Sequence, residues 1–223
     1  MKIYDLRKNF DRFKLHIDRL EIPEGKIYGI IGPNGCGKTT AMKIMAGVMK
    51  PDSGHIDYEG LTSRDITMSF RKPYLIHDTV YKNLIYPLKI RKVKPDTQLV
   101  EHLLEITGLQ ELRNQYALSL SSGEQQKLSL IRTFIFEPKL IFIDETLSNM
   151  DIESVALFEE YILNIQKVKP VTWVVISHQL SNIRRLCGHV FFMYDGAIKV
   201  SGPTDELLEN PESEELKRYL QYV

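Results

Sequence analysis

The sequence predicts an α/β fold, with a mixed or parallel sheet flanked by helices, an N-terminal antiparallel β part and an inserted α-helical subdomain. Two short apolar runs, at residues 140–143 and 171–176, are typical of parallel strands that are covered on both faces. A glycine-rich loop at residues 32–40 stands between another apolar run and a helical pattern. From about residue 78 to residue 136, apolar side chains recur at helical spacing instead.

These patterns are expected to form a single domain of 223 residues. Its α/β core would comprise residues 1–77 and 137–223, and its helical subdomain residues 78–136. At the start of the core, residues 1–31 read as short strands with apolar side chains largely at even intervals. Residues 55–58 follow a turn and predict an edge strand or one arm of a hairpin.

The helical subdomain is expected to begin with two helices. The first carries Val80 and Leu84 on one face, and we expect Pro87 to interrupt it. The second is predicted to be capped by Asp96 and ended by Gly108.

A third helix is predicted to be capped by Ser121 or Ser122 and to end before Pro138. The core then resumes with the two apolar strands. Its remaining elements are expected to be a helix at about 151–167, a hairpin at 190–200, and two short helices at about 204–209 and 213–222.

The composition argues against several classes of protein. Lys plus Arg and Asp plus Glu both number 29, so the formal net charge is zero, and we expect no nucleic-acid partner. Cys36 and Cys187 are too few for a disulfide framework and lack metal-ligand spacing, which favours a reducing cytoplasm. No run approaches the roughly 18 apolar residues of a membrane span, and the N-terminus lacks the apolar stretch of a signal peptide. A membrane role is therefore expected to come through a partner.

The glycine-rich loop fits the phosphate-binding pattern G-x-x-x-x-G-K-[ST]. Its residues are Gly32, Pro33, Asn34, Gly35, Cys36, Gly37, Lys38, Thr39 and Thr40. Glycines let the backbone wrap closely round an anion, and the following helix offers unpaired N–H groups. Lys38 is expected to reach the β- and γ-phosphates, and Thr39 to offer its hydroxyl to Mg²⁺. The alternative, an ordinary glycine-rich turn, does not explain the complete motif, so the sequence predicts a nucleoside triphosphate site.

Two acids follow the strand at residues 140–143 directly. Asp144 is expected to hold the metal, and Glu145 to orient or deprotonate an attacking water. His178, at the end of another strand, is expected to touch the γ-phosphate. The competing interpretation is a pair of solvated carboxylates and a structural histidine.

With these motifs, the sequence resembles the ABC-type ATPases, and the resemblance covers essentially the whole chain. The residues that carry it, besides the phosphate loop, are Ser121, Ser122, Gly123 and Glu124 as the signature motif, Asp144 and Glu145 as the end of the Walker B strand, Ser148 to Asp151 as the D-loop, and His178 as the switch histidine. The resemblance implies that two subunits pair head to tail around two ATP molecules with Mg²⁺. Each site would then join the phosphate loop of one subunit to the signature of the other, with Glu145, His178 and Asp151 serving hydrolysis. An aromatic side chain of the N-terminal strands is expected to stack on adenine, and Phe10 is the first choice, with Phe13 and Tyr4 as alternatives.

The sequence departs from the family pattern in several places. Arg71 stands where a glutamine that touches Mg²⁺ and the attacking water is usual, and residues 41–97 contain no glutamine. Because arginine cannot be a neutral ligand of Mg²⁺, we expect slow basal hydrolysis and a faster Arg71→Gln variant. Ser122 replaces the usual glycine, Glu124 replaces the commoner glutamine, and Thr146 replaces a proline.

Three functions are compatible with the family. The first is the ATPase subunit of a transporter, with separate transmembrane permease subunits docked on the helical subdomain. The docking residues would be Tyr74, Leu75, Ile76, Val80 and Tyr81, unless they are ordinary core. Residues 79–88 resemble importer subunits for oxyanions such as tungstate or molybdate. This function implies a second ATPase subunit (identical or related), a solute-binding protein, and a cytoplasmic location on the inner face of the membrane.

The other two functions are a soluble ABC ATPase in DNA repair, chromosome structure or ribosome work, and an accessory ATPase in cofactor assembly such as iron–sulfur biogenesis. Chromosome-type members need long coiled coils between the loop and the signature, and residues 40–120 contain no sustained heptads. Ribosome-type members usually carry two cassettes in one chain, and the length of this chain does not exclude a role in cofactor assembly. Of the three functions we favour the transporter.

Overall fold

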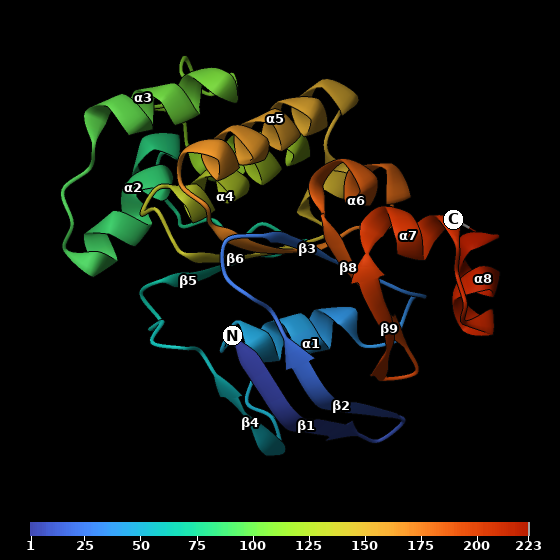
Figure 1. The fold of residues 1–223 in the computed structure, drawn as a ribbon. Coiled ribbons are helices and arrows are strands. Elements are labelled where there is room, and N and C mark those ends of the chain that lie inside the picture. The colour runs from blue at the N-terminus through green and yellow to red at the C-terminus, as the bar shows by residue number, and fades with distance from the viewer. Residues whose placement is uncertain (223) are drawn as a thin grey trace.

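The protein is built round a six-stranded central sheet (Figure 1). The computed structural model describes residues 1–222, apart from the side chains of Ser148 and Asn149. Across the sheet the strands are β5 (Ile66–Ser69), β6 (Leu140–Asp144), β7 (Thr172–Ile176), β3 (Ile27–Ile31), β8 (His189–Tyr194) and β9 (Ala197–Pro203). All neighbours are parallel except β9, which pairs antiparallel with β8 and forms the predicted hairpin. The predicted α/β class is thus confirmed.

A smaller antiparallel sheet forms the predicted N-terminal β part. Its strands, in spatial order, are β2 (Phe13–Glu21), β1 (Lys2–Phe10) and β4 (Ser53–Asp57), so β4 is the predicted edge strand. Helix α1 (Lys38–Met45) lies between the two sheets (Figure 1). Ile3 and Leu15 from the small sheet, Met42 from the helix and Phe142 from β6 belong to one buried cluster. Their burial holds α1, and the loop before it, against the central sheet.

The other helices lie on the opposite side of the central sheet and beyond it (Figure 1). They are α2 (Val80–Arg91), α3 (Thr97–Ile106), α4 (Ser122–Phe134), α5 (Ile152–Val168), α6 (Leu180–Leu186), α7 (Thr204–Glu209) and α8 (Glu214–Leu220), with short 3₁₀ helices η1 (Ala117–Ser119) and η2 (Thr146–Asn149). One continuous buried cluster joins Leu84 of α2 and Leu103 of α3 to Leu128 of α4, Phe158 of α5 and Trp173 of β7. Because this cluster runs across the subdomain and the core, the boundaries at residues 78 and 136 stay a prediction.

The expected interruption at Pro87 is wrong, because α2 continues through this proline to Arg91. A proline inside a helix costs about 3 kcal/mol, since it removes one hydrogen bond and crowds the preceding turn. Leu84 and Leu88, one turn apart on either side of Pro87, are both buried. Burial of each leucine contributes about 1.5–3 kcal/mol, which is enough to keep the helix continuous.

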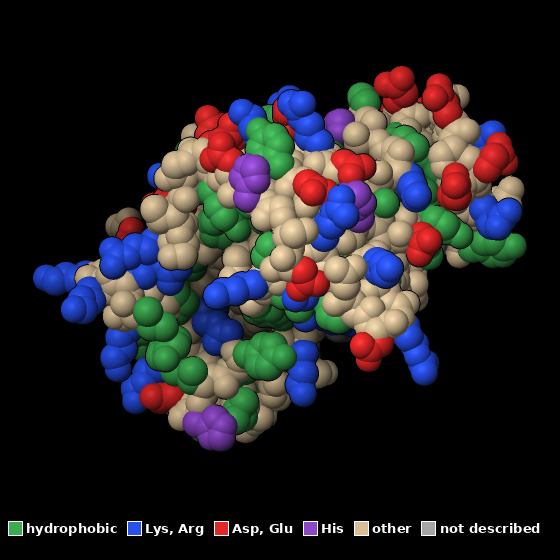
Figure 2. All heavy atoms as spheres, turned by 90° about the horizontal axis from the view of Figure 1, so that it is seen from below, with side chains coloured by type: hydrophobic (Ala, Val, Ile, Leu, Met, Phe, Trp, Pro, Cys, Tyr) green, Lys and Arg blue, Asp and Glu red, His purple; other side chains and the backbone are tan. Residues whose placement is uncertain are grey.

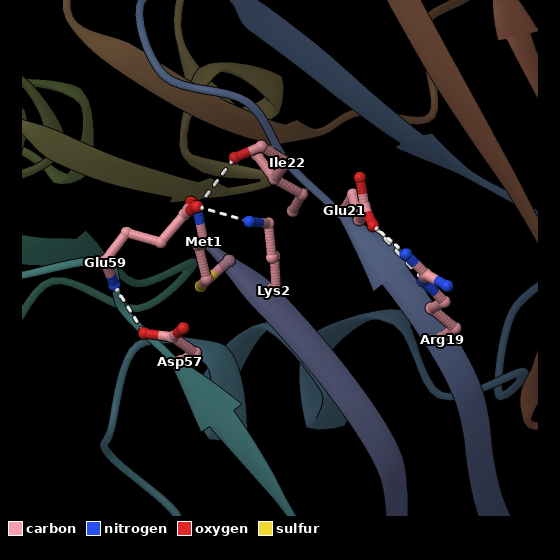
Figure 3. Close-up of polar contacts among 7 residues, drawn as sticks. All are labelled: Met1, Lys2, Arg19, Glu21, Ile22, Asp57 and Glu59. Atoms are coloured by element: carbon pink, nitrogen blue, oxygen red, sulfur yellow. Dashed lines mark hydrogen bonds and ion pairs between the residues drawn. The ribbon is translucent and has the colours of Figure 1, made fainter.

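Polar contacts connect the start of β1 to the turn after β4 (Figure 3). Lys2 Nζ lies 2.9 Å from Glu59 Oε1, and the amino group of Met1 donates to Glu59 and to the carbonyl of Ile22. The backbone N–H of Glu59 donates to Asp57 Oδ1 at 2.8 Å. Hydrogen bonds from Lys2 and from the amino group of Met1 lower the pKa of Glu59 to about 2.

No described helix is both long and apolar enough to cross a membrane. Charged side chains are nevertheless unevenly distributed over the surface (Figure 2). Lys and Arg gather on the side where α2 lies, and Asp and Glu at the opposite end, where α7 and α8 lie.

Candidate nucleotide-binding and hydrolysis site

The glycine-rich loop runs from the end of β3 to the start of α1, the strand–loop–helix context that a phosphate site needs. Two of its glycines are required by geometry. Gly32 has φ 148°, and a Cβ there would lie 2.0 Å from the carbonyl oxygen of Met193. Gly37 has φ 106°, and a Cβ there would lie 2.5 Å from Cζ of Phe13. Gly37 also precedes α1 without a side-chain cap, so the first N–H groups of this helix remain available to an anion.

Lys38 points back across this loop. Its Nζ donates to the carbonyl of Gly32 at 2.7 Å and to that of Pro33 at 2.9 Å, and only 6% of the residue is exposed. Burial lowers the pKa of Lys38. A phosphate beside this ammonium would supply full negative charge, whereas the two carbonyl oxygens supply only partial negative charge.

Thr39 and Asp144 form the part of the site that suits a divalent cation. Thr39 Oγ1 donates to Asp144 Oδ1 at 3.0 Å, and Asp144 is 4% exposed at the end of β6. Burial raises the pKa of Asp144, so the carboxylate gains from a nearby positive charge. A hydroxyl and a carboxylate oxygen are ligands that Mg²⁺ prefers, and this donor set fits the ion.

Glu145 is the next residue, and it lies in the left-handed region with φ 50°. Its backbone N–H donates to the carbonyl of Ile176 in β7 at 3.0 Å. His178 Nε2 lies 2.6 Å from Glu145 Oε1, and Arg71 Nη1 lies 3.2 Å from Glu145 Oε2. The structure therefore brings together three side chains that the sequence predicted separately, and both oxygens of the carboxylate are engaged.

The start of α4, where the sequence predicts the signature motif, is closed by a capping box between Ser121 and Glu124. Ser121, not Ser122, is the N-cap, which decides between the two predicted alternatives. Its Oγ accepts from the N–H of Glu124 at 3.4 Å, while Glu124 Oε2 accepts from the N–H of Ser121 at 2.8 Å and from its Oγ at 2.7 Å. These bonds from Ser121 lower the pKa of Glu124. Binding of a phosphate at this helix start stays a prediction. Gly123, in the first turn, has open space around it.

Comparison with known families decides the class of this site. Residues 15–148 match the profile of the family described as ABC transporter, and they include the phosphate loop, Ser121 to Glu124, Asp144 and Glu145. The chain belongs to the ABC transporter family. It is an ABC ATPase, and its nucleotide is ATP with Mg²⁺.

Individual relatives of this ABC ATPase are import subunits. The chain is 35% identical over 190 residues to the tungstate uptake system ATP-binding protein TupC of Peptoclostridium acidaminophilum, covering 82% of this chain and 89% of TupC. It is 29% identical over 230 residues to the molybdate/tungstate import ATP-binding protein WtpC of Pyrococcus horikoshii, covering 99% of this chain and 67% of WtpC. It is 33% identical over 204 residues to the Fe(3+) ions import ATP-binding protein FbpC of Vibrio cholerae, covering 87% of this chain but only 58% of FbpC. These names favour the transporter over the soluble alternatives.

Solved structures share the fold of this ABC ATPase. An ATP-binding subunit of an ABC transporter superposes with a TM-score of 0.85 at 24% identity, covering 99% of this chain and 98% of that one. A dimeric post-hydrolysis state of the ATP-binding cassette MJ0796 bound to ADP and Pi superposes with a TM-score of 0.79 at 23% identity, covering 91% of this chain and 98% of that one. At this level of identity the likeness supports the fold alone.

One predicted site residue, Asp151, has other contacts in this ABC ATPase. Asp151 caps α5, where it accepts from the N–H of Ser154 at 2.8 Å and from its hydroxyl at 2.7 Å. Asp151 Oδ2 also lies 3.7 Å from Lys127 Nζ, so a role for Asp151 in hydrolysis stays a prediction. The side chains of Ser148 and Asn149, in the predicted D-loop, lie outside the described residues.

The predicted adenine stack also stays a prediction. Phe10 is 44% exposed, and its ring centroid lies 6.2 Å from that of Phe13. Phe13 is the ring that reaches the loop at Gly37. Tyr4 stacks on His55 instead, with ring centroids 4.8 Å apart.

The sequence did not predict the supports behind Glu145. Thr146 Oγ1 donates to Ser69 Oγ, the last residue of β5, at 2.8 Å. Gln126 of α4 donates from Nε2 to the carbonyl of Thr146 at 3.2 Å. All three residues are buried. No local pattern in the sequence pointed to these contacts, because they join residues that are 77 and 20 positions apart in the chain.

Proposed function

We propose that this chain is the ATP-hydrolysing subunit of an importer for a small oxyanion of the tungstate or molybdate class. The observation that carries this proposal is the similarity to TupC, which extends over 82% of this chain and 89% of that relative. The proposal includes transmembrane permease subunits, a second ATPase subunit and a solute-binding protein. The chain would then act on the cytoplasmic, inner face of the membrane.

In the proposed reaction, Glu145 accepts a proton from the water that attacks the γ-phosphorus. A P–O bond to this water forms while the bond to the leaving ADP breaks, and the products are ADP and phosphate. Lys38 and the N–H groups at the start of α1 face the negative charge of the phosphates. Mg²⁺, held by Thr39 and Asp144, would neutralise part of this charge.

The proposed reaction uses two chains, as the family resemblance implies, and this fits the separate clefts that the phosphate loop and the start of α4 line. Gly32, Pro33 and Asn34 line a cleft of about 280 Å³ together with His178. Ser122 lines a separate cleft of about 690 Å³ together with Arg71 and Gln126, among others. A head-to-tail pair would bring the α4 start of one subunit to the ATP of the other.

Exposed apolar side chains support docking of a permease beside α2. Tyr74 is 64% exposed, and Tyr86 and Ile90 of α2 are 38% and 62% exposed. Of the residues that the sequence proposed for docking, Leu75, Ile76 and Tyr81 are half-buried. The docking role expected for Val80 is wrong, because Val80 is fully buried in the first turn of α2 and belongs to the core.

The experiment is purification of the tagged chain from detergent-solubilised membranes of cells that express it at native level. Co-purification of two membrane proteins, and ATP hydrolysis stimulated by tungstate or molybdate with the solute-binding protein in vesicles, is the expected result. Sulfate at the same concentration is the control ligand, and Glu145→Gln is the control for the ATPase. Co-purification of ribosomes, nucleic acid or a soluble scaffold, with no membrane protein, would refute the proposal.

A further inference from the structure

The carboxylate of Glu145 is held between two cationic or polar side chains. His178 approaches Oε1 from the end of β7, and Arg71 approaches Oε2 from the segment that follows β5. The side chain of Glu145 is 8% exposed and that of Arg71 is 69% exposed. Arg71 therefore closes the solvent side of this cluster, and its guanidinium engages the one oxygen that His178 leaves free.

Hydrogen bonds on both sides of Arg71 hold this segment in place. Ser69, two residues before Arg71, accepts a hydrogen bond from Thr146, the neighbour of Glu145. On the other side, Arg132 of α4 donates to the carbonyl of Tyr74. Residues 70–74 thus connect η2, which follows Glu145, to α4, and a movement between these elements would move Arg71.

This arrangement has a direct chemical consequence. A carboxylate that is paired with a guanidinium is attracted to that cation, and turning it toward a water breaks the pair. A glutamine side chain at residue 71 would carry no net charge and would exert no such attraction. The opposite possibility is that Arg71 turns to the γ-phosphate and stabilises the transition state, in which case its loss would slow hydrolysis.

We propose that Arg71 is a positioning residue that holds Glu145 in a resting orientation, and that hydrolysis begins only when residues 70–74 move and the Arg71–Glu145 pair opens. This inference rests on the reaction given under the proposed function, in which Glu145 acts on the attacking water, and concerns the control of that step. The pair is partly exposed, and exposed pairs are weak. Its removal should therefore raise kcat by about fivefold, which corresponds to ~1 kcal/mol of activation free energy.

The test compares steady-state ATP hydrolysis by the purified full-length chain and its Arg71→Gln, Arg71→Lys and Lys72→Gln variants. Arg71→Gln should raise kcat about fivefold and change KM for ATP less than about twofold, because the pair acts on the reacting water and not on nucleotide binding. Arg71→Lys keeps the charge and should stay close to the unmodified chain. Lys72→Gln is the matched control, since Lys72 is the adjacent, exposed basic residue and its loss removes the same charge.

The salt dependence of kcat is a second readout. A purely structural role of Arg71 would not change how kcat responds to salt. Raising KCl from about 50 to about 500 mM screens a partly exposed pair, so it should speed the unmodified chain and Lys72→Gln more than Arg71→Gln. An unchanged or lower kcat for Arg71→Gln, or an identical salt response in all variants, would overturn the inference.

Failure of this inference can be told from failure of the proposed function. If the unmodified chain hydrolyses ATP, Lys38→Ala does not, and Arg71→Gln equals the unmodified chain, only the role of Arg71 is refuted. If the unmodified chain and Arg71→Gln both lack activity that depends on Lys38, the ATPase function itself is refuted.

Discussion

Glu124 offers the sharpest test of the signature region, because its carboxylate occupies the start of α4. Replacing it by glutamine removes the negative charge but keeps a side chain that can accept the same hydrogen bonds from Ser121. A charge at the first turn of a helix contributes about 0.3–1 kcal/mol to the stability of that helix, so Glu124→Gln should cost at most about this much in unfolding free energy.

ATP-driven pairing should respond in the opposite direction. A γ-phosphate approaching Ser121 must displace the Glu124 carboxylate and is repelled by it, and removal of about 1 kcal/mol of this cost corresponds to about a fivefold gain in affinity. In a Glu145→Gln background, which blocks hydrolysis, the ATP concentration for half-maximal dimer in sedimentation experiments should fall by about fivefold.

Glu105→Gln is the control, because Glu105 is an exposed acid on α3 in the same subdomain. It should leave the dimer curve unchanged. Weaker pairing of Glu124→Gln than of its parent would refute the reasoning, since the carboxylate would then assist the contact between subunits.

Two further predictions concern the thiol in the phosphate loop and the acid in the turn after β4. Cys36 is 5% exposed and burial raises its pKa, so alkylation of the thiol should be slow near neutral pH and faster as pH rises. The alkylated chain should no longer bind ATP. Equal alkylation rates with and without saturating ATP would contradict this prediction. Glu59 has its pKa lowered from 4.5 to about 2, so its stabilising contribution is complete above about pH 4.5 and is lost as pH falls toward about 2. Glu59→Gln should therefore lower the urea midpoint near neutral pH, and the difference from the unmodified chain should shrink below pH about 4.5; a constant difference down to pH about 2 would refute the role of Glu59.

Local signals in the sequence were enough for most elements. Asp96 caps α3 as predicted, because an N-cap depends only on the residue and on the next turn. The apolar run at residues 140–143 became β6, because both faces of this strand are covered. Pro87 failed as a helix breaker, since the burial of Leu84 and Leu88 is a tertiary effect that no local rule contains.

The site shows the same limit. The chemistry of Lys38, Thr39, Asp144 and Glu145 follows from their motifs and from the ends of parallel strands, which meet at one edge of the sheet. The contact between Arg71 and Glu145 could not be predicted, because it joins two strand ends that are 74 residues apart in sequence (145 − 71). The structure pairs Arg71 with the carboxylate that follows Asp144, the predicted metal ligand.

The most direct test of the central claim is a structure of the Glu145→Gln variant with ATP and Mg²⁺. The account predicts a head-to-tail dimer in which the γ-phosphate contacts Lys38 of one subunit and Ser121 of the partner subunit within hydrogen-bond distance. A nucleotide-loaded assembly in which Ser121 lies far from every triphosphate would contradict it.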